Sequence, residues 1–252
     1  MEENENIFDK LHELYGSNAG SFNILEHQID IDLQVQYFEL SRQVKKGLSP
    51  QMVMSDSEQL FSERADEENK KEILAKLASV EEVEAFRIIE RYYEVAPEEM
   101  KAWSALALQE SKMMLESMFL DENQVLISTG LGGKGQKLRY FVVLMGRSED
   151  HLTNLQKRII KNEFSFVLDK HDSEVENIDF SGTLVTVMAV VPMNEPVKGV
   201  FEEAINECNN YGDFLEDNFI ITNVKELSFE EIRGFLKNTD HIDNSADEEN
   251  FL

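Results

Sequence analysis

The stretch STGLGGKGQKLRYFVVLMG, residues 128–146, divides the chain into two kinds of sequence. Its first half holds four glycines and Lys134, and its second half is rich in β-branched and aromatic residues. Glycine adopts positive φ angles without strain, and β-branched residues suit extended backbone, so the stretch predicts a loop followed by a strand. Helical patterns come before about residue 122, and strands alternate with helices after it.

The first half of the chain is predicted to be all helical. Residues 5–16 have an apolar stripe at helical spacing, and a second helix is expected over residues 23–47, with Asn23 as its N-cap. Residues 66–119 contain one proline and no glycine, and they predict three helices. The second of these three begins with a possible capping box, Ser79 and Glu82.

Part of this half resembles the tetratricopeptide and HEAT families of helical repeats. The resemblance covers residues 69–119, and Tyr92 departs from it where a small residue is usual. It implies a helical scaffold that binds other proteins, and an ordinary helical bundle is the alternative. The residues that match the tetratricopeptide spacing are Ala85, Ile89, Pro97, Trp103, Leu106 and Ala107.

The second half predicts the order β-β-α-β-α-β-α. Strands are expected at 123–129, 137–146, 184–191 and 217–227, and Phe164–Leu168 could be helix or strand. Ser148 is expected to cap one helix, and Ser228 with Glu231 to form a capping box for the last. The fold class is therefore α+β, with an all-helical half before a four-stranded α+β sandwich. We expect domains at 1–121 and 122–238, and a disordered acidic tail at 239–252.

The glycine-rich stretch does not satisfy the phosphate-loop pattern. That pattern requires a glycine at 128 and a hydroxyl at 135, where this chain has Ser128 and Gly135, and it requires a helix where a strand is predicted. The dinucleotide-binding spacing of glycines is present, but it too lacks its helix. Two alternatives stay open, a plain hairpin turn and a loop that contacts a ligand or partner.

Charge is unevenly distributed along the chain. Its formal net charge is −26, yet residues 130–161 contain seven basic and two acidic side chains. Such a basic island predicts one of two things: a site that binds an anion, or a surface that packs against the acidic helical half of the same chain. The strong negative charge itself fits either simple solubility or a basic partner. The basic residues are Lys134, Lys137, Arg139, Arg147, Lys157, Arg158 and Lys161.

No catalytic or metal-binding pattern stands out, so we expect no catalytic residues, no metal and no cofactor. Cys208 is the only cysteine, which excludes an intramolecular disulfide. His171 lies among acidic residues in KHDSEVEN, where a solvated loop is favoured over a metal site. The acidic, polar N-terminus and the absence of a long apolar run predict a cytoplasmic protein.

These features favour a non-enzymatic interaction or regulatory protein with a protein partner. The acidic helical half and the glycine loop would make the contacts, and we expect neither membrane association nor direct nucleic-acid binding. The alternative is a protein or enzyme that binds a small anionic ligand with the Lys134 loop, and a third possibility is mimicry of nucleic acid. The expected contact residues are Gly130, Gly132, Gly133, Lys134, Gly135, Lys137 and Arg139.

Overall fold

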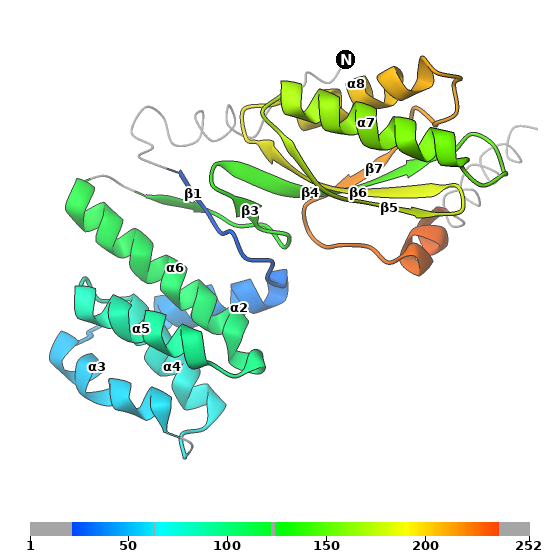
Figure 1. Ribbon diagram of the computed structural model, residues 1–252. Helices are drawn as coiled ribbons and strands as arrows, with labels where there is room; N and C mark the ends of the chain where they lie inside the picture. Colours follow the sequence, from blue (N-terminus) through cyan, green and yellow to red (C-terminus); the bar gives the residue numbers. More distant parts are fainter. Residues whose placement is uncertain (1–21, 63, 122–123, 237–252) are drawn as a thin grey trace, which may run out of the picture. The chain divides into compact units, whose positions relative to one another are not determined.

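The computed structural model describes residues 22–62, 64–121 and 124–236 (Figure 1). The expected helix at 5–16 and the expected tail at 239–252 lie outside these residues. The described chain forms two compact units, one ending at Leu138 and the other beginning at Arg139. The division therefore follows residue 138, whereas we expected it at 121. The reason is that residues 125–127, which follow the last helix of this unit, pair with residues 22–24 at its start.

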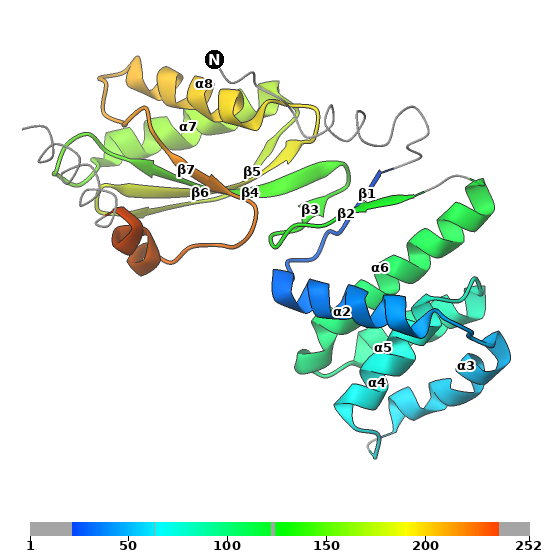
Figure 2. The same ribbon diagram turned by 180° about the vertical axis from the view of Figure 1, so that it is seen from behind.

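The first unit is built mainly from helices. The long helix α6 packs against α4 and α5, and α2 packs against α4 (Figures 1 and 2). The elements are β1 (Phe22–Ile24), α2 (Ile31–Val44), α3 (Pro50–Asp56), the 3-10 helix η2 (Ser57–Phe61), α4 (Glu67–Ala78), α5 (Val83–Val95), α6 (Glu98–Leu120) and β2 (Val125–Ile127).

Trp103 and Tyr37 join these helices in the core of the first unit. Their rings meet edge to face with centroids 5.2 Å apart, and Tyr37 is fully buried. The indole Nε1 donates to the Lys71 carbonyl at 3.2 Å, so the polar atom of the tryptophan is satisfied. Trp103 is thus a packing residue that links α2, α4 and α6.

Glu110 on α6 gathers the polar groups of α2. Its carboxylate accepts hydrogen bonds from the Tyr37 hydroxyl at 2.6 Å and the Ser41 hydroxyl at 2.7 Å, and it pairs with Lys45 at 2.7 Å. Burial and the neighbouring Glu110 raise the pKa of the Tyr37 hydroxyl, which keeps it a hydrogen-bond donor. Three donors on one half-enclosed carboxylate fix the register of α2 against α6.

Residues 22–30 differ from the prediction, because they do not begin a helix. Phe22–Ile24 form β1, which pairs in parallel with β2, and α2 begins only at Ile31. The N-cap is Asp30, whose carboxylate accepts from the N–H groups of Asp32 and Leu33, rather than Asn23. The partner of β1 lies about 100 residues away, so local periodicity could not reveal this strand.

The expected helix caps are partly confirmed. Ser228 and Glu231 form the predicted capping box, with reciprocal hydrogen bonds of 2.8 and 3.2 Å. Ser79 instead ends α4, and Glu82 precedes α5 without a side-chain cap, so that prediction is wrong. The helix expected to begin at Ser148 begins at Asn154, with a capping box of Thr153 and Gln156.

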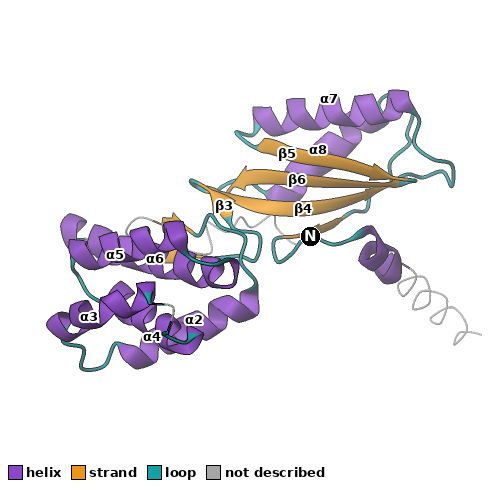
Figure 3. Cartoon of the chain, turned by 60° about the horizontal axis from the view of Figure 1, so that its bottom comes forward, coloured by secondary structure: helices purple, strands orange, loops and turns teal. Residues whose placement is uncertain are grey.

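The second unit is a sheet with two long helices on one face (Figures 1 and 3). Residues 229–236 add a short helix. The elements are β4 (Lys137–Met145, whose first two residues belong to the other unit), α7 (Asn154–Lys170), β5 (Glu174–Ser181), β6 (Leu184–Pro192), α8 (Val197–Asn209) and β7 (Ile220–Thr222).

The strand order is β7-β4-β6-β5, with the two-residue strand β3 (Gly133–Lys134) paired to the first residues of β4. The chain order β4-α7-β5-β6-α8-β7 makes two split β-α-β units, because β6 lies between β4 and β5, and β4 lies between β6 and β7. This is the ferredoxin-like arrangement. Helices α7 and α8 pack against each other, with Phe164 and Phe201 in contact between them.

The α+β class, helical first and sheet-containing second, is confirmed. The membership of the sheet differs in two places from the four strands that we expected. The strand expected at 123–129 corresponds to β2, which pairs with β1 instead of joining the sheet, and β5 at Glu174–Ser181 takes its place. Phe164–Leu168 is helical, within α7. No helix in the described parts is long and apolar enough to span a membrane.

We predict that Glu110→Ala lowers the free energy of unfolding of the helical unit by about 2–4 kcal/mol, because it leaves the buried Tyr37 hydroxyl without its acceptor. Urea denaturation followed by fluorescence of Trp103, the only tryptophan, measures this change. The control is Glu90→Ala, which removes an exposed pair with Arg87 and should cost less than about 1 kcal/mol. Equal losses in the two variants would contradict the role assigned to Glu110.

Candidate functional site

The glycine-rich loop folds back on the connection between β1 and α2. The Ile29 N–H donates to the Gly130 carbonyl at 3.1 Å, and Leu131 is fully buried. The amide of Gln34, itself buried, donates to the carbonyls of Ile29 and Thr129. The loop is therefore part of the packed structure of the helical unit.

The backbone N–H groups of this loop are used within the chain. Gly132 donates to the Thr129 carbonyl, Gly133 to the Glu26 carbonyl at 3.4 Å, and Gly135 to the Glu26 carboxylate at 3.0 Å. A phosphate-binding loop instead points such groups at its ligand. The geometry is that of a hairpin anchored to Glu26.

Close packing explains two of the glycines. Gly132 has φ +67°, and a Cβ atom there would lie 2.5 Å from the His27 carbonyl oxygen. A Cβ atom on Gly133 would meet the Lys137 carbonyl. Gly135 also has positive φ, at +60°, but the space around it is open. These requirements account for the glycine-rich composition that the sequence alone left unexplained.

The predicted contact residues fall into two groups. Lys134 lies opposite Lys137 where β3 pairs with β4, in the helical unit. Arg139 belongs to the second unit, where its guanidinium donates two hydrogen bonds, of 2.5 and 2.9 Å, to the carboxylate of Glu176 on β5. Glu176 lies at a β-bulge, which turns its side chain toward Arg139. Whether these residues contact a ligand or partner stays a prediction.

The rest of the basic island is also divided. Arg147 forms ion pairs with Asp213 at 3.3 Å and Asp217 at 2.8 Å. The remaining three cations, Lys157, Arg158 and Lys161, lie on α7, and we call them the α7 cationic face. None of the three has an Asp or Glu partner within 4 Å among the described residues.

Most other cations of the second unit have carboxylate partners, although Arg233 donates to the Ser181 hydroxyl instead. Lys170 pairs with Glu203 at 2.6 Å, Lys198 with Glu202 at 3.5 Å and Lys225 with Glu231 at 2.5 Å. The α7 cationic face is thus a local positive surface in an acidic protein.

Aromatic and apolar groups accompany the α7 cationic face. The ammonium groups of Lys157 and Lys161 lie 5.5 and 5.6 Å from the centroid of the Phe180 ring on β5. Leu155 and Phe166 on the same helix are 58% and 68% exposed. The three cations can be read from the sequence, but the contact of Lys157 and Lys161 with an aromatic ring cannot. That contact requires Phe180, which β5 places against α7.

His171 joins two carboxylates at the end of α7. Its Nδ1 lies 2.8 Å from Glu195 and its Nε2 lies 3.0 Å from Glu203, which also pairs with Lys170. The sequence placed His171 beside Asp172 and Glu174 in a loop. Its partners in the structure are Glu195, which precedes α8, and Glu203, which lies within α8. No group of three or more potential metal ligands gathers within the described ranges.

Comparison with known proteins gives only distant structural matches. No family model and no curated protein matches the chain. A proposed transposase from Deinococcus radiodurans is 13% identical over 42% of this chain and 93% of that chain, with a TM-score of 0.34. A REP-associated tyrosine transposase bound to a REP hairpin is 9% identical over 45% and 69%, with a TM-score of 0.31. The C-terminal segment of the alpha subunit of aIF2 from Pyrococcus abyssi is 11% identical over 77% and 98%, with a TM-score of 0.25.

These matches contradict two expectations from the sequence. We expected a non-enzymatic, protein-binding chain, with an anionic-ligand protein as the alternative, and no direct nucleic-acid binding, whereas the matches include two transposases, one bound to a REP hairpin. Both expectations are withdrawn. None of the three matches is described as a helical-repeat protein, and the resemblance to those families stays a prediction. At these TM-scores the matches carry no argument for a function, which must come from the side chains of this chain.

We predict that Gly132→Ala destabilises the helical unit by about 3 kcal/mol or more, because it combines positive φ with a backbone clash. The control Gly135→Ala keeps the positive φ but meets open space, so it should cost about 1–2 kcal/mol. Urea denaturation followed by Trp103 fluorescence measures both variants. A smaller loss for Gly132→Ala than for Gly135→Ala would contradict the close packing.

We predict that His171 stabilises the second unit more at pH 5.5 than at pH 8.5. Its hydrogen bond to Glu203, together with Glu195, raises the pKa of His171 above 6.5 in the folded protein. A raised folded pKa adds stability below the unfolded pKa, and this is lost as pH rises through the folded pKa. Thermal unfolding of His171→Gln should therefore show a loss, below about 1 kcal/mol, that shrinks with rising pH. A loss that is constant or grows with pH would contradict this.

Proposed function

We propose that the second unit binds nucleic acid through the α7 cationic face. The observation that carries the proposal is the absence of carboxylate partners for Lys157, Arg158 and Lys161 in the described parts of a strongly acidic chain. Cations without a carboxylate partner are available for the phosphate groups of a polynucleotide, where contacts release condensed counterions. The three side chains lie within about 6 Å along the helix axis, close enough to follow one strand.

The acidic remainder of the chain limits this binding. A net charge of −26 repels a phosphate backbone at long range, but about 0.1–0.15 M salt screens that repulsion beyond about 8–10 Å. Contacts at the surface of α7 act within that distance. We therefore expect weak affinity, on the order of 10⁻⁴ to 10⁻⁵ M at about 0.1 M salt, as for sequence-independent phosphate contacts.

The aromatic groups near α7 favour unpaired nucleotides. Phe166 is 68% exposed and lies on the helix that carries the cations, about 80° around the helix from Arg158 and about 12 Å along its axis, although it faces away from Lys157. Exposed aromatic rings stack on the bases of single strands, whereas the bases of a duplex are stacked on each other. Phe180 instead lies against Lys157 and Lys161 and orients their ammonium groups.

We predict that replacing Lys157, Arg158 and Lys161 by Gln lowers affinity for a single-stranded oligonucleotide by about ten-fold or more. Fluorescence anisotropy with labelled single-stranded, hairpin and duplex oligonucleotides between 25 and 200 mM salt measures the change. For the unchanged protein, log K should fall with log salt with a slope of about −2 for single strands, as three phosphate contacts imply.

The matched control replaces Lys170, Lys198 and Lys225 by Gln. It removes the same charge from the same unit, but from cations that already have carboxylate partners. At about 0.15–0.2 M salt its affinity should stay within about two-fold of the unchanged protein, since charge more than about 8 Å away is then screened. Equal losses in the two triple variants, or no binding of any oligonucleotide at 25 mM salt, would overturn the proposal.

A further inference from the structure

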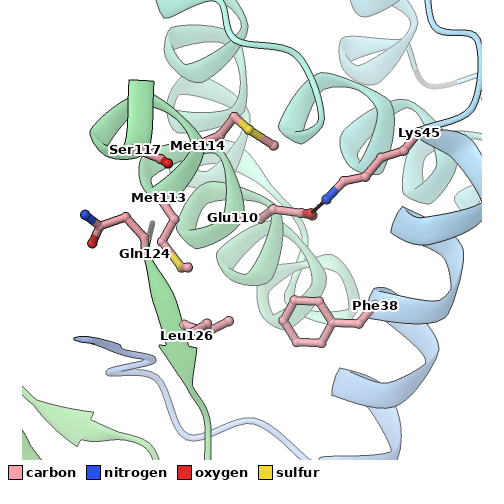
Figure 4. Close-up of a pocket in the computed structure, with 8 residues that line it drawn as sticks. All are labelled: Phe38, Lys45, Glu110, Met113, Met114, Ser117, Gln124 and Leu126. Carbon is pink, nitrogen blue, oxygen red and sulfur yellow. Dashed lines mark ion pairs between the residues drawn. The ribbon is translucent and has the colours of Figure 1, made fainter. Parts of the chain in front are cut away.

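An apolar groove lies between α2, α6 and β2 in the helical unit. It has a volume of about 240 Å³, and Phe38, Met113, Met114 and Leu126 line it. Figure 4 shows Met113, Leu126 and Phe38 around this space, with the pair of Lys45 and Glu110 beside it. Methionine side chains are flexible and polarisable, and they are common on surfaces that receive an apolar partner.

The apolar surface continues from the groove to the end of α6. Met118, which is 42% exposed, lies one turn beyond Met114 on the same helical row. Phe119 and Leu120 are also exposed, but they lie about 100° and about 200° further around the helix. From Glu110 to Met118 the apolar surface extends about 12 Å along the helix.

The described chain begins next to this surface. Phe22 pairs with Val125, and Asn23 donates to the side chains of Gln124 at 2.7 Å and Glu116 at 3.2 Å. Gln124 lines the groove, and its Nε2 atom is buried without a hydrogen-bond partner in the described chain. The first described residues of the chain therefore lie beside the groove.

We propose that residues 5–16 of the same chain dock into this groove as an amphipathic helix. Their sequence places five apolar residues on one helical face, and that face needs an apolar partner. A helix from residue 7 to residue 15 is about 12 Å long, which matches the apolar surface of α6. The apolar residues of the segment are Ile7, Phe8, Leu11, Leu14 and Tyr15.

The connection between segment and groove is long enough. Six residue steps separate Gly16 from Phe22, and an extended chain of that length spans about 20 Å. The connecting sequence SNAGS, residues 17–21, contains only small or polar residues. A tether this short also gives the segment a high effective concentration at the groove, which favours it over a second copy of the chain.

Alkylation of a cysteine in the groove tests the docking. In the variant Met114→Cys, the thiol should react with a maleimide about five-fold faster or more when Phe8→Asp and Leu11→Asp remove the apolar contact of the segment. Cys208 does not interfere, because it is fully buried and burial raises the pKa of its thiol to about 12.

The matched control for alkylation is Asn6→Asp with His12→Asp. It adds the same negative charge to the segment but outside the apolar stripe, so the reaction rate of Met114→Cys should not change. Equal rates in the two double variants would overturn the proposal.

A disulfide identifies the occupant. The double variant Phe8→Cys with Met114→Cys should form a disulfide within one chain under mild oxidation. The control pairs Phe8→Cys with Val95→Cys, which is 65% exposed and therefore at least as accessible as Met114, but precedes the other end of α6. Disulfide-linked dimers instead of the intrachain bond, or equal yields for the two pairs, would overturn docking by the same chain.

Discussion

The burial of β4 on both of its faces is the constraint on which the second unit depends. Five consecutive residues from Tyr140 to Leu144 are at most 7% exposed. A strand of this kind needs neighbours on both edges and cover for its side chains, because exposed apolar surface and unpaired backbone groups both cost free energy. β6 and β7 supply the neighbours, and α7 with α8 cover one face. The ferredoxin-like order meets this requirement, because it places β4 between β7 and β6.

Ion pairs with carboxylates, and not the local composition alone, decide which parts of the surface are positive. Lys45, Arg139 and Arg147 each meet carboxylates that lie far away in the sequence. The basic island of residues 130–161 is therefore divided between the two units, and several of its cations are paired. What remains positive is the α7 cationic face, which is small but lies on one rigid helix. A rigid helix holds its charges at fixed spacing, which suits repeated phosphate groups better than a mobile loop does.

Helical and strand periodicity predicted much of the fold, and long-range pairing accounts for the errors. The apolar stripe of residues 197–209, the strand at 184–191 and the Ser228 cap are all present in the structure. β1 was missed because its three residues gain their hydrogen bonds from β2. β5 was missed because its exposed residues do not show the apolar pattern of a central strand. The partners of His171 were also missed, since Glu195 and Glu203 are brought to it only by the packing of α8 on α7.

The sequence by itself determined the α+β class, the order of helical and strand-rich halves, and the failure of residues 128–135 as a phosphate loop. Those conclusions need only local spacing and the residue types that a loop requires. Only the tertiary structure decided that Gly132 and Gly133 serve close packing, and that no carboxylate of the described residues pairs with Lys157, Arg158 and Lys161. Both depend on atoms brought together from distant parts of the chain, and no local pattern records which carboxylate or carbonyl will lie within a few ångströms.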